Sequence, residues 1–263
     1  MQEVSGQLDR GDGVELAWAH LPGAGPTVVF LPGFRSDMAG AKAIELRDWC
    51  AGQGRAMLRL DYSGHGASGG AFDRGTIGRW AADARLVIET VVRGPLLLVG
   101  SSMGGWIALL LAPHLPVAGL VGIAAAPDFT ETLMWAAMAP PERALLLERG
   151  WIEVPSEYGE PLRITRALIE DGREHPVLGA PIPITCPVRL LQGQRDDDVP
   201  WETALRISEN LASTDVQVVL VKDGDHRLSR PQDLTLLRRT VADFGGEDGG
   251  EAFAVAGIEP AQL

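Results

Sequence analysis

The sequence predicts an α/β fold built on a mostly parallel sheet with helices on its faces. Short runs of aliphatic and β-branched residues alternate with longer amphipathic stretches, which is typical of strands that are each followed by a helix. The chain has 263 residues and is 46% hydrophobic, which is enough for one sizeable core. We therefore expect a single domain with an inserted cap.

The position of each element follows from local composition. Strands are expected where valine, leucine and isoleucine cluster, and helices where apolar residues recur with helical spacing. The expected strands cover residues 14–20, 27–31, 56–60, 96–100, 117–124, 188–192 and 216–221. The expected helices cover residues 39–51, 77–92, 106–112, 201–211 and 234–244.

The regular alternation stops between residues 127 and 185. This segment has prolines and closely spaced methionine and tryptophan residues in helical stretches. We expect residues 127–185 to form a helical cap over the carboxyl ends of the strands, and residues 1–126 and 186–245 to form the core. Residues 246–263 are rich in glycine, glutamate and alanine, and we expect a mobile tail there.

Charge and composition limit the partners of the chain. The formal net charge is −12, whereas nucleic acids and anionic membrane surfaces are bound through basic patches. No stretch approaches the roughly 18 apolar residues of a membrane span, and the first ten residues do not resemble a signal peptide. Two cysteines indicate a reducing compartment, and the preference for arginine over lysine indicates a GC-rich bacterial genome. We expect a cytoplasmic protein with no nucleic-acid or integral membrane partner.

A Gly-x-Ser-x-Gly motif at residues 100–104 joins an expected strand to an expected helix. In that context the motif forms a nucleophile elbow, a strained turn that exposes the serine hydroxyl. Gly100 and Gly104 leave room for the turn because neither has a Cβ atom. The N–H of Met103, in the first helical turn, has no acceptor within the helix and can bind an oxyanion. Ser102 is therefore the expected nucleophile of a serine hydrolase.

A serine nucleophile needs a histidine base and a carboxylate that orients the histidine. In hydrolases with this elbow, the acid and then the histidine follow the serine along the chain. Of five histidines, only His226 lies in a polar loop after the last expected strand. The strand before it is followed by three adjacent acids, Asp196, Asp197 and Asp198. Asp128, after an earlier strand, is a further alternative.

Several segments together carry a family resemblance. They are Leu31-Pro32-Gly33-Phe34, Asp61-Tyr62-Ser63-Gly64, residues 99–106, residues 181–187, residues 193–201 and Asp225-His226-Arg227. In order and spacing they resemble the α/β-hydrolase superfamily as far as residue 245, and within it the abhydrolase-domain protein ten group. That group includes a mitochondrial palmitoyl-protein thioesterase that also hydrolyses acyl glucuronides. The start of this chain is not like a transit peptide, so the resemblance does not extend to a mitochondrial location.

The resemblance implies roles for particular residues. Ser102, Asp196 and His226 match the nucleophile, acid and base, and Asp196 fits a Gly-x-x-Asp-x-x-Val-Pro pattern of many members, with Asp198 as the second choice. The turn after residues 27–31 supplies an oxyanion donor in this fold, so the N–H of Phe34 is expected to act with that of Met103. The apolar side chains expected to contact an acyl chain are Trp106, Met134, Trp135 and Met138. The cap side chains would equally fit a role in packing the cap onto the sheet.

The main expectation is a serine hydrolase that cleaves fatty-acyl thioesters and acyl esters, with an acylated protein or a small acyl compound as substrate. The alternatives are a small-molecule carboxylesterase or acyl-glucuronidase, and a ligand-binding relative without turnover. The glycine-rich loop at residues 61–69 lacks the Gly-Lys-Ser/Thr ending of a phosphate loop. No pair of histidines or cysteines has metal-ligand spacing, so neither a metal nor a cofactor is expected.

Overall fold

The computed structural model describes residues 2–155 and 161–244, and its centre is an eight-stranded sheet. The strand order is β1-β2-β4-β3-β5-β6-β9-β10, and every neighbouring pair is parallel except β1 with β2 and β2 with β4. The strands are β1 (Val4–Asp9), β2 (Glu15–Leu21), β3 (Ala24–Leu31), β4 (Arg55–Leu60), β5 (Leu96–Ser101), β6 (Val117–Ile123), β9 (Val188–Gly193) and β10 (Val216–Val221). The expected mostly parallel α/β architecture is confirmed.

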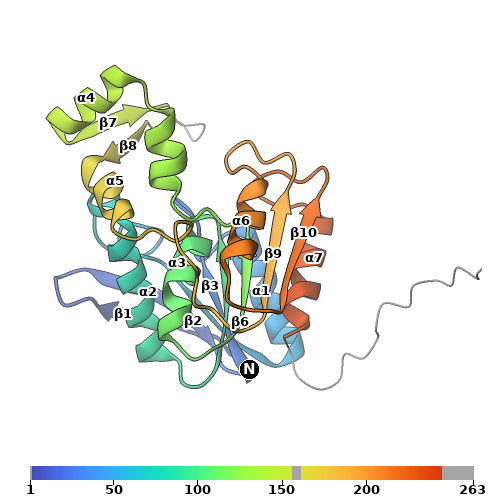
Figure 1. Ribbon diagram of the computed structural model, residues 1–263. Helices are drawn as coiled ribbons and strands as arrows, with labels where there is room; N and C mark the ends of the chain where they lie inside the picture. Colours follow the sequence, from blue (N-terminus) through green and yellow to red (C-terminus); the bar gives the residue numbers. More distant parts are fainter. Residues whose placement is uncertain (1, 156–160, 245–263) are drawn as a thin grey trace, which may run out of the picture.

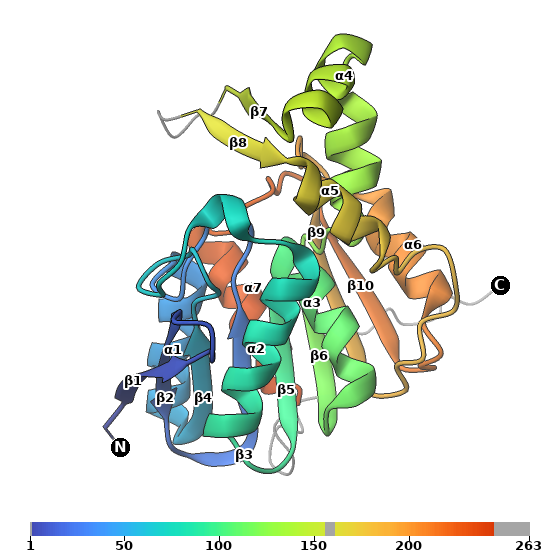
Figure 2. The same cartoon turned by 90° about the vertical axis from the view of Figure 1, so that its left-hand side faces the viewer.

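Helices cover both faces of the sheet (Figures 1 and 2). One face carries α2 (Ile77–Val91), α3 (Met103–Leu111) and α6 (Glu202–Asn210), and the other carries α1 (Ala41–Gln53) and α7 (Pro231–Ala242). Side chains of β5 alternate between the two cores, because successive residues of a strand point to opposite faces. Leu96 and Leu98 pack with α2 and α3, and Leu97 and Val99 pack with α1 and α7. A strand that is buried on both sides therefore reads as an unbroken apolar run.

Two elements differ from the expectation. Strand β1 was not expected, because it is an edge strand that pairs only with β2 and whose residues are mostly exposed or half-buried. Helix α7 begins at Pro231, earlier than residue 234. Proline suits the first helical position, where an N–H would have no partner, and Asp233 accepts a hydrogen bond from the backbone N–H of Arg230 at 3.0 Å.

The segment between β6 and β9 stands over the carboxyl ends of the strands (Figure 1). It contains a π-helical stretch (Thr130–Trp135), α4 (Pro140–Arg149), β7 (Trp151–Val154), β8 (Leu162–Thr165) and α5 (Arg166–Arg173). The expected helical segments are present, and the cap also contains an antiparallel pair of strands that was not expected, β7 with β8. Trp151 stabilises this pair, with Arg149 at 3.3 Å and Arg163 at 4.1 Å from its ring centroid.

The cap also has a small core of its own, formed by Met138, Leu146, Ile152, Ile164 and Ile169. The proposed cap limits of 127–185 stay a prediction. The tail expected at residues 246–263 lies outside the described residues. Within the described ranges, no helix combines the length and the apolar character needed to cross a membrane.

Candidate active site

Ser102 lies at the sharp turn between β5 and α3. Its backbone has φ 55° and ψ −118°, a conformation that residues with a side chain rarely adopt. A Cβ atom on Gly100 would overlap the carbonyl of Gly104, and one on Gly104 would overlap the carbonyl of Leu31. The two glycines of the motif are therefore required by close backbone contacts on both sides of the turn.

Hydrogen bonds of the backbone hold Ser102 in this conformation. Its N–H donates to the carbonyl of Ile123 at 2.9 Å. Its own carbonyl accepts from the N–H groups of Gly105 at 2.9 Å and Ala126 at 3.1 Å. The strained turn is thus tied to the neighbouring strand β6 and to the first turn of α3, which fixes the direction of the side chain.

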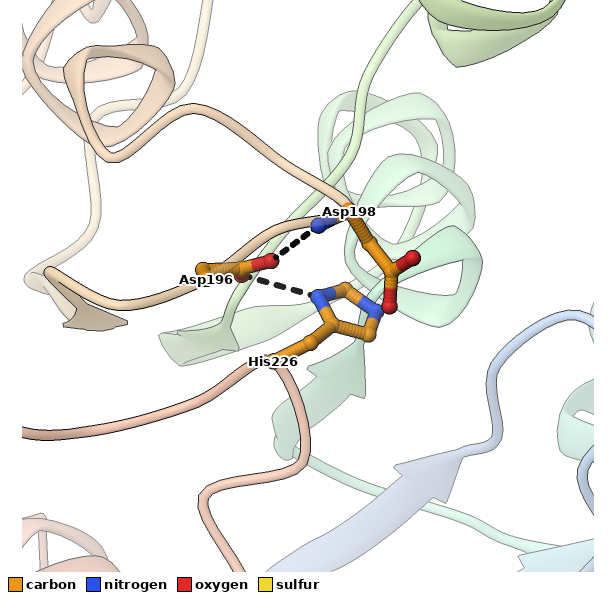
Figure 3. A group of neighbouring side chains, drawn as sticks. All are labelled: Asp196, Asp198 and His226. Carbon is orange, nitrogen blue, oxygen red and sulfur yellow. Dashed lines mark hydrogen bonds and ion pairs between the residues drawn. The ribbon is translucent and has the colours of Figure 1, made fainter.

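The Ser102 side chain meets His226, and His226 meets Asp196. Ser102 Oγ lies 3.0 Å from His226 Nε2, and His226 Nδ1 lies 2.8 Å from Asp196 Oδ2 (Figure 3 shows the second contact). An ionised carboxylate can only accept hydrogen bonds, so Nδ1 carries the proton and Nε2 accepts from the serine hydroxyl. The three residues come from loops that follow β5, β9 and β10, at the carboxyl edge of the sheet.

Asp196 is surrounded by donors. Besides His226, its carboxylate accepts from Gln192 Nε2 at 2.8 Å and from the N–H groups of Val199 at 2.8 Å and Asp198 at 2.9 Å. Burial raises the pKa of Asp196, but the hydrogen bond and charge of His226 and the two backbone donors outweigh burial, so its pKa lies below the ordinary value. The carboxylate therefore stays ionised beside the imidazole.

The two alternative acids have other surroundings. Asp128 accepts from the N–H groups of Val177 at 2.8 Å and Leu178 at 2.9 Å, and so joins the end of β6 to the segment that leads out of the cap. Asp198 contributes its backbone N–H to Asp196, while its exposed side chain lies beside the imidazole ring (Figure 3). Of the three acids, the structure places Asp196 in hydrogen-bond contact with His226.

Asp196, Asp198 and His226 also have donor atoms within 4.8 Å of one another, a spacing that metal ligands can have. The chemistry of the group argues for hydrogen bonding. The carboxylate of Asp196 is already filled by N–H donors, and the ring nitrogen that faces it carries a proton. Only an exposed carboxylate and one ring nitrogen are left, which is a poor set for a metal site.

The loops that carry Asp196 and His226 touch each other. A Cβ atom on Gly193 would overlap the carbonyl of Gly224, so the two backbones are in close contact. The N–H of Arg195 donates to the carbonyl of Gly224 at 2.8 Å, and that of Gln194 to the carbonyl of Val221 at 2.9 Å. The acid and the histidine are therefore held at a fixed separation by backbone contacts as well as by their own hydrogen bond.

The turn after β3 lies against the serine. A Cβ atom on Gly33 would stand 3.3 Å from Ser102 Cβ and 3.9 Å from Ser102 Oγ. The ring of Phe34 packs edge-on against Phe72, Phe129 and Trp80, which anchors the turn. Within the described part of the chain, the N–H groups of Phe34 and Met103 have no hydrogen-bond acceptor. Both are thus free to bind a ligand.

A cavity of about 540 Å³ opens beside Ser102 and His226. Gly33 and Phe34 form part of its wall. The rest of its lining includes the polar side chains Arg35, Ser36, Asp37, Lys42, Arg227 and Ser229. Lys42 was not singled out from the sequence, because it lies on α1 outside every motif. Three of these six side chains are cationic, so the cavity suits a polar or anionic group.

The apolar residues expected to bind an acyl chain lie elsewhere. Trp106 is fully buried and its Nε1 donates to the carbonyl of His175 at 3.1 Å, so the expectation that it contacts substrate was wrong. Met138 belongs to the core of the cap, and Met134 and Trp135 are half-buried against it. None of the four lines the cavity beside Ser102. An acyl groove at the three cap residues stays a prediction.

The comparisons with known proteins agree with this fold. Residues 28–235 match the alpha/beta hydrolase family, and the chain is a hydrolase that belongs to it. Among its relatives, the mouse protein named "Palmitoyl-protein thioesterase ABHD10, mitochondrial" is 39% identical over 241 residues, which are 90% of this chain and 81% of the relative. The human protein of the same name is 38% identical over 90% of this chain and 78% of its own length.

Two solved structures extend the comparison. Mouse alpha/beta hydrolase domain-containing protein 10 superimposes with a TM-score of 0.83 at 37% identity, covering 91% of this chain and 97% of the mouse chain. A protein from Agrobacterium vitis S4 gives a TM-score of 0.86 at 45% identity, covering 92% of this chain and 98% of the other. The resemblance to the abhydrolase-domain protein ten group is thus confirmed over most of the chain.

Proposed function

We propose that this hydrolase cleaves fatty-acyl thioesters, such as S-acyl-cysteine in proteins, with Ser102 as the nucleophile. The observation that carries the proposal is the line of hydrogen bonds from Ser102 through His226 to Asp196, beside a cavity. The thioester as substrate class is supported by the name palmitoyl-protein thioesterase of relatives that match 90% of the chain.

In the acylation step, His226 Nε2 takes the proton of Ser102 as Oγ attacks the acyl carbonyl carbon. The N–H groups of Phe34 and Met103 bind the oxyanion, and one such donor typically contributes about 3 to 4 kcal/mol to the transition state. The C–S bond then breaks, and His226 returns the proton to the leaving thiolate. Asp196 holds the imidazole in the required tautomer and stabilises its cation.

In the deacylation step, a water molecule replaces the thiol. His226 Nε2 takes a proton from the water as its oxygen attacks the acyl-Ser102 carbonyl. The same two N–H groups bind the second oxyanion, and the proton passes to Ser102 Oγ as the ester bond breaks. The products are a free fatty acid and the original enzyme, so every proton is returned and no cofactor takes part.

The second candidate function is hydrolysis of small acyl esters, including acyl glucuronides. The arginines that line the cavity favour it, because Arg35 and Arg227 would stabilise a hydrophilic or acidic leaving group. The catalytic residues would be the same, since an ester oxygen and a thioester sulfur are both displaced through the same tetrahedral intermediate.

A matched series of substrates separates the two functions. We would measure kcat/KM for S-acyl-cysteine peptides, p-nitrophenyl esters and acyl glucuronides, each from acetyl to palmitoyl, with Ser102→Ala as the blank. A rise of kcat/KM toward long acyl-cysteine peptides supports the thioesterase. A preference for short chains or glucuronides supports the esterase.

A fluorophosphonate probe tests the nucleophile without assuming a substrate. Wild-type protein should be labelled at Ser102, and labelling should be lost in Ser102→Ala and His226→Ala. Folded wild-type protein that takes up no label would contradict both candidate functions.

A reducing compartment is the proposed location. Both cysteines, Cys50 and Cys186, are free thiols, and burial raises the pKa of each above its ordinary value, which keeps them unreactive. The cytoplasm of a bacterium fits this chemistry. A mitochondrial location is named for the relatives and is the alternative.

A further inference from the structure

Lys42 reaches from α1 to the loop that carries His226. Its Nζ donates to the carbonyl of Arg227 at 2.5 Å and lies 3.3 Å from Ser229 Oγ. Ser229 Oγ donates to the same carbonyl at 2.9 Å. Arg227, whose carbonyl accepts both hydrogen bonds, is the residue directly after His226. The contact therefore joins a helix near the amino terminus to the peptide next to the histidine.

The loop between β10 and α7 also has anchors farther from the histidine. Arg230 pairs with Asp223 and Asp233, both at 2.8 Å, and the N–H of Leu228 donates to Asp225 Oδ1 at 2.9 Å. These contacts fix the two ends and the bend of the loop. The contact of Lys42 adds a hold at the peptide that follows His226, and it comes from a different element.

We propose that Lys42 is a positioning residue, whose ammonium group holds the Arg227 carbonyl and so keeps the His226 imidazole aligned between Ser102 and Asp196. The proposal deepens the proposed function and rests on it, because alignment matters only if His226 transfers a proton. A displacement of about 1 Å in such a group can reduce the rate about 100-fold. Within the described residues, Lys42 makes no hydrogen bond to Ser102 or to the imidazole, so its effect passes through the loop.

The charge of Lys42 is sensitive to pH. The pKa of Lys42 is lowered to about 8, mainly by burial and to a lesser extent by the charge of Arg227, against the opposing effects of Asp225 on the loop and Asp233 on α7. Asp37 and Arg35, on the loop before α1, line the same cavity, and Glu45 on α1 is paired with Arg238 of α7. Above about pH 8 the ammonium becomes an amine, and its hydrogen bond to the carbonyl is no longer charge-assisted and weakens.

The wild-type enzyme should accordingly lose kcat above about pH 8. A fall of kcat at alkaline pH points to a group other than the catalytic base, because a general base acts in its unprotonated form. Lys42→Met should lower kcat about 10-fold to 100-fold at pH 7 with KM nearly unchanged. Lys42→Arg keeps its charge to pH 9 and should recover part of kcat without the alkaline fall. Lys42→Gln keeps a neutral donor and should lie between these two variants.

Lys222→Met is the matched control. Lys222 is the other lysine of the chain, lies exposed in the same loop and has no partner within the described residues. Its replacement removes the same charge and should leave kcat, KM and the pH profile as in the wild type. Initial rates would be measured on one S-acyl-cysteine peptide and one p-nitrophenyl ester from pH 6 to pH 9.

Hydrogen exchange of the peptide that spans residues 222–230 gives a readout that needs no substrate. Exchange should be faster in Lys42→Met than in Lys222→Met at pH 7. A Lys42→Met enzyme with wild-type kcat and pH profile would overturn the proposal, as would a rise in KM alone, which would make Lys42 a substrate contact. If the wild-type enzyme hydrolysed none of the substrates, the proposed function would be contradicted. Independently of that result, an unchanged rate of hydrogen exchange at residues 222–230 in Lys42→Met would overturn the role of Lys42.

Discussion

The substitution Asp196→Asn tests the assignment of the acid, because it changes charge and donor pattern with almost no change in shape. Two backbone N–H groups, of Asp198 and Val199, bind Oδ1, and an amide oxygen can keep both bonds. The other oxygen, Oδ2, accepts from His226 Nδ1 and from Gln192 Nε2. In the variant this position becomes an NH₂ group, which donates and cannot accept.

The variant should fold and fail in catalysis. The side-chain amide of Gln192 can flip by 180°, because its Oε1 is buried without a partner and could then accept a hydrogen bond from the new NH₂ group. The imidazole must then carry its proton on Nε2, and a protonated Nε2 can no longer accept the proton of Ser102. The same change in a serine protease lowers kcat about 10⁴-fold, which corresponds to about 5 kcal/mol of transition-state stabilisation. We expect a loss of that size here.

Stability and activity would be measured on the same preparations. Thermal unfolding of Asp196→Asn should shift by no more than about 4 °C, as expected for a loss near 1 kcal/mol. Asp198→Asn is the matched control, since only the backbone N–H of Asp198 contacts Asp196, and kcat/KM should change less than about threefold. The reasoning is refuted if Asp196→Asn keeps more than a tenth of the activity while Asp198→Asn loses it.

Three further predictions concern packing, pH and the cap. Gly104→Ala would place a Cβ atom onto the carbonyl of Leu31, so it should destabilise the fold by more than about 3 kcal/mol and abolish fluorophosphonate labelling. Gly52→Ala is the control, because a Cβ atom there has no neighbour within 4 Å, and it should leave both stability and labelling unchanged. Burial lowers the pKa of His65 to about 4, so the folded protein binds a proton at this ring less readily than the unfolded chain does. The free energy of unfolding should therefore be unaffected above about pH 6.5 and should decrease by about 3 kcal/mol as the pH falls toward 4. Urea unfolding from pH 7 to pH 4.5 should show this loss in the wild type and a smaller loss in His65→Phe. The same dependence of the free energy of unfolding on pH in both proteins would contradict the role of His65. Trp135→Ala should lower kcat/KM for long acyl chains more than for acetyl substrates, and an equal loss on both would leave the acyl groove without support.

The elbow could be predicted because its determinants are local. Gly100, Ser102 and Gly104 stand within five residues, between an apolar run and a helix, and the backbone contacts that require the glycines belong to the same turn or to the neighbouring strand. The parallel strands could be predicted for a related reason, since burial on both faces leaves an unbroken apolar run in the sequence.

Other features depend on contacts between distant segments and left little trace in the sequence. Residue type alone does not distinguish the three adjacent aspartates; a family pattern favoured Asp196, and its hydrogen bond to His226 depends on the turn after β9. The short strands β7 and β8 gain stability from Trp151 and the cap core, which no local pattern reveals. Trp106 stands next to the elbow in sequence, yet its indole turns into the core. Lys42 meets Arg227 across 185 positions of the chain.

The close contact between Gly193 and Gly224 bears on how this enzyme could be remodelled. Because one backbone fills the space where the other would carry a side chain, the two loops form a single structural module. A larger residue at either glycine would displace both the acid and the base relative to Ser102. Transplanting the His226 loop from a relative should therefore succeed only when the Asp196 loop is exchanged with it, and the two segments are expected to diverge together as the family acquires new substrates.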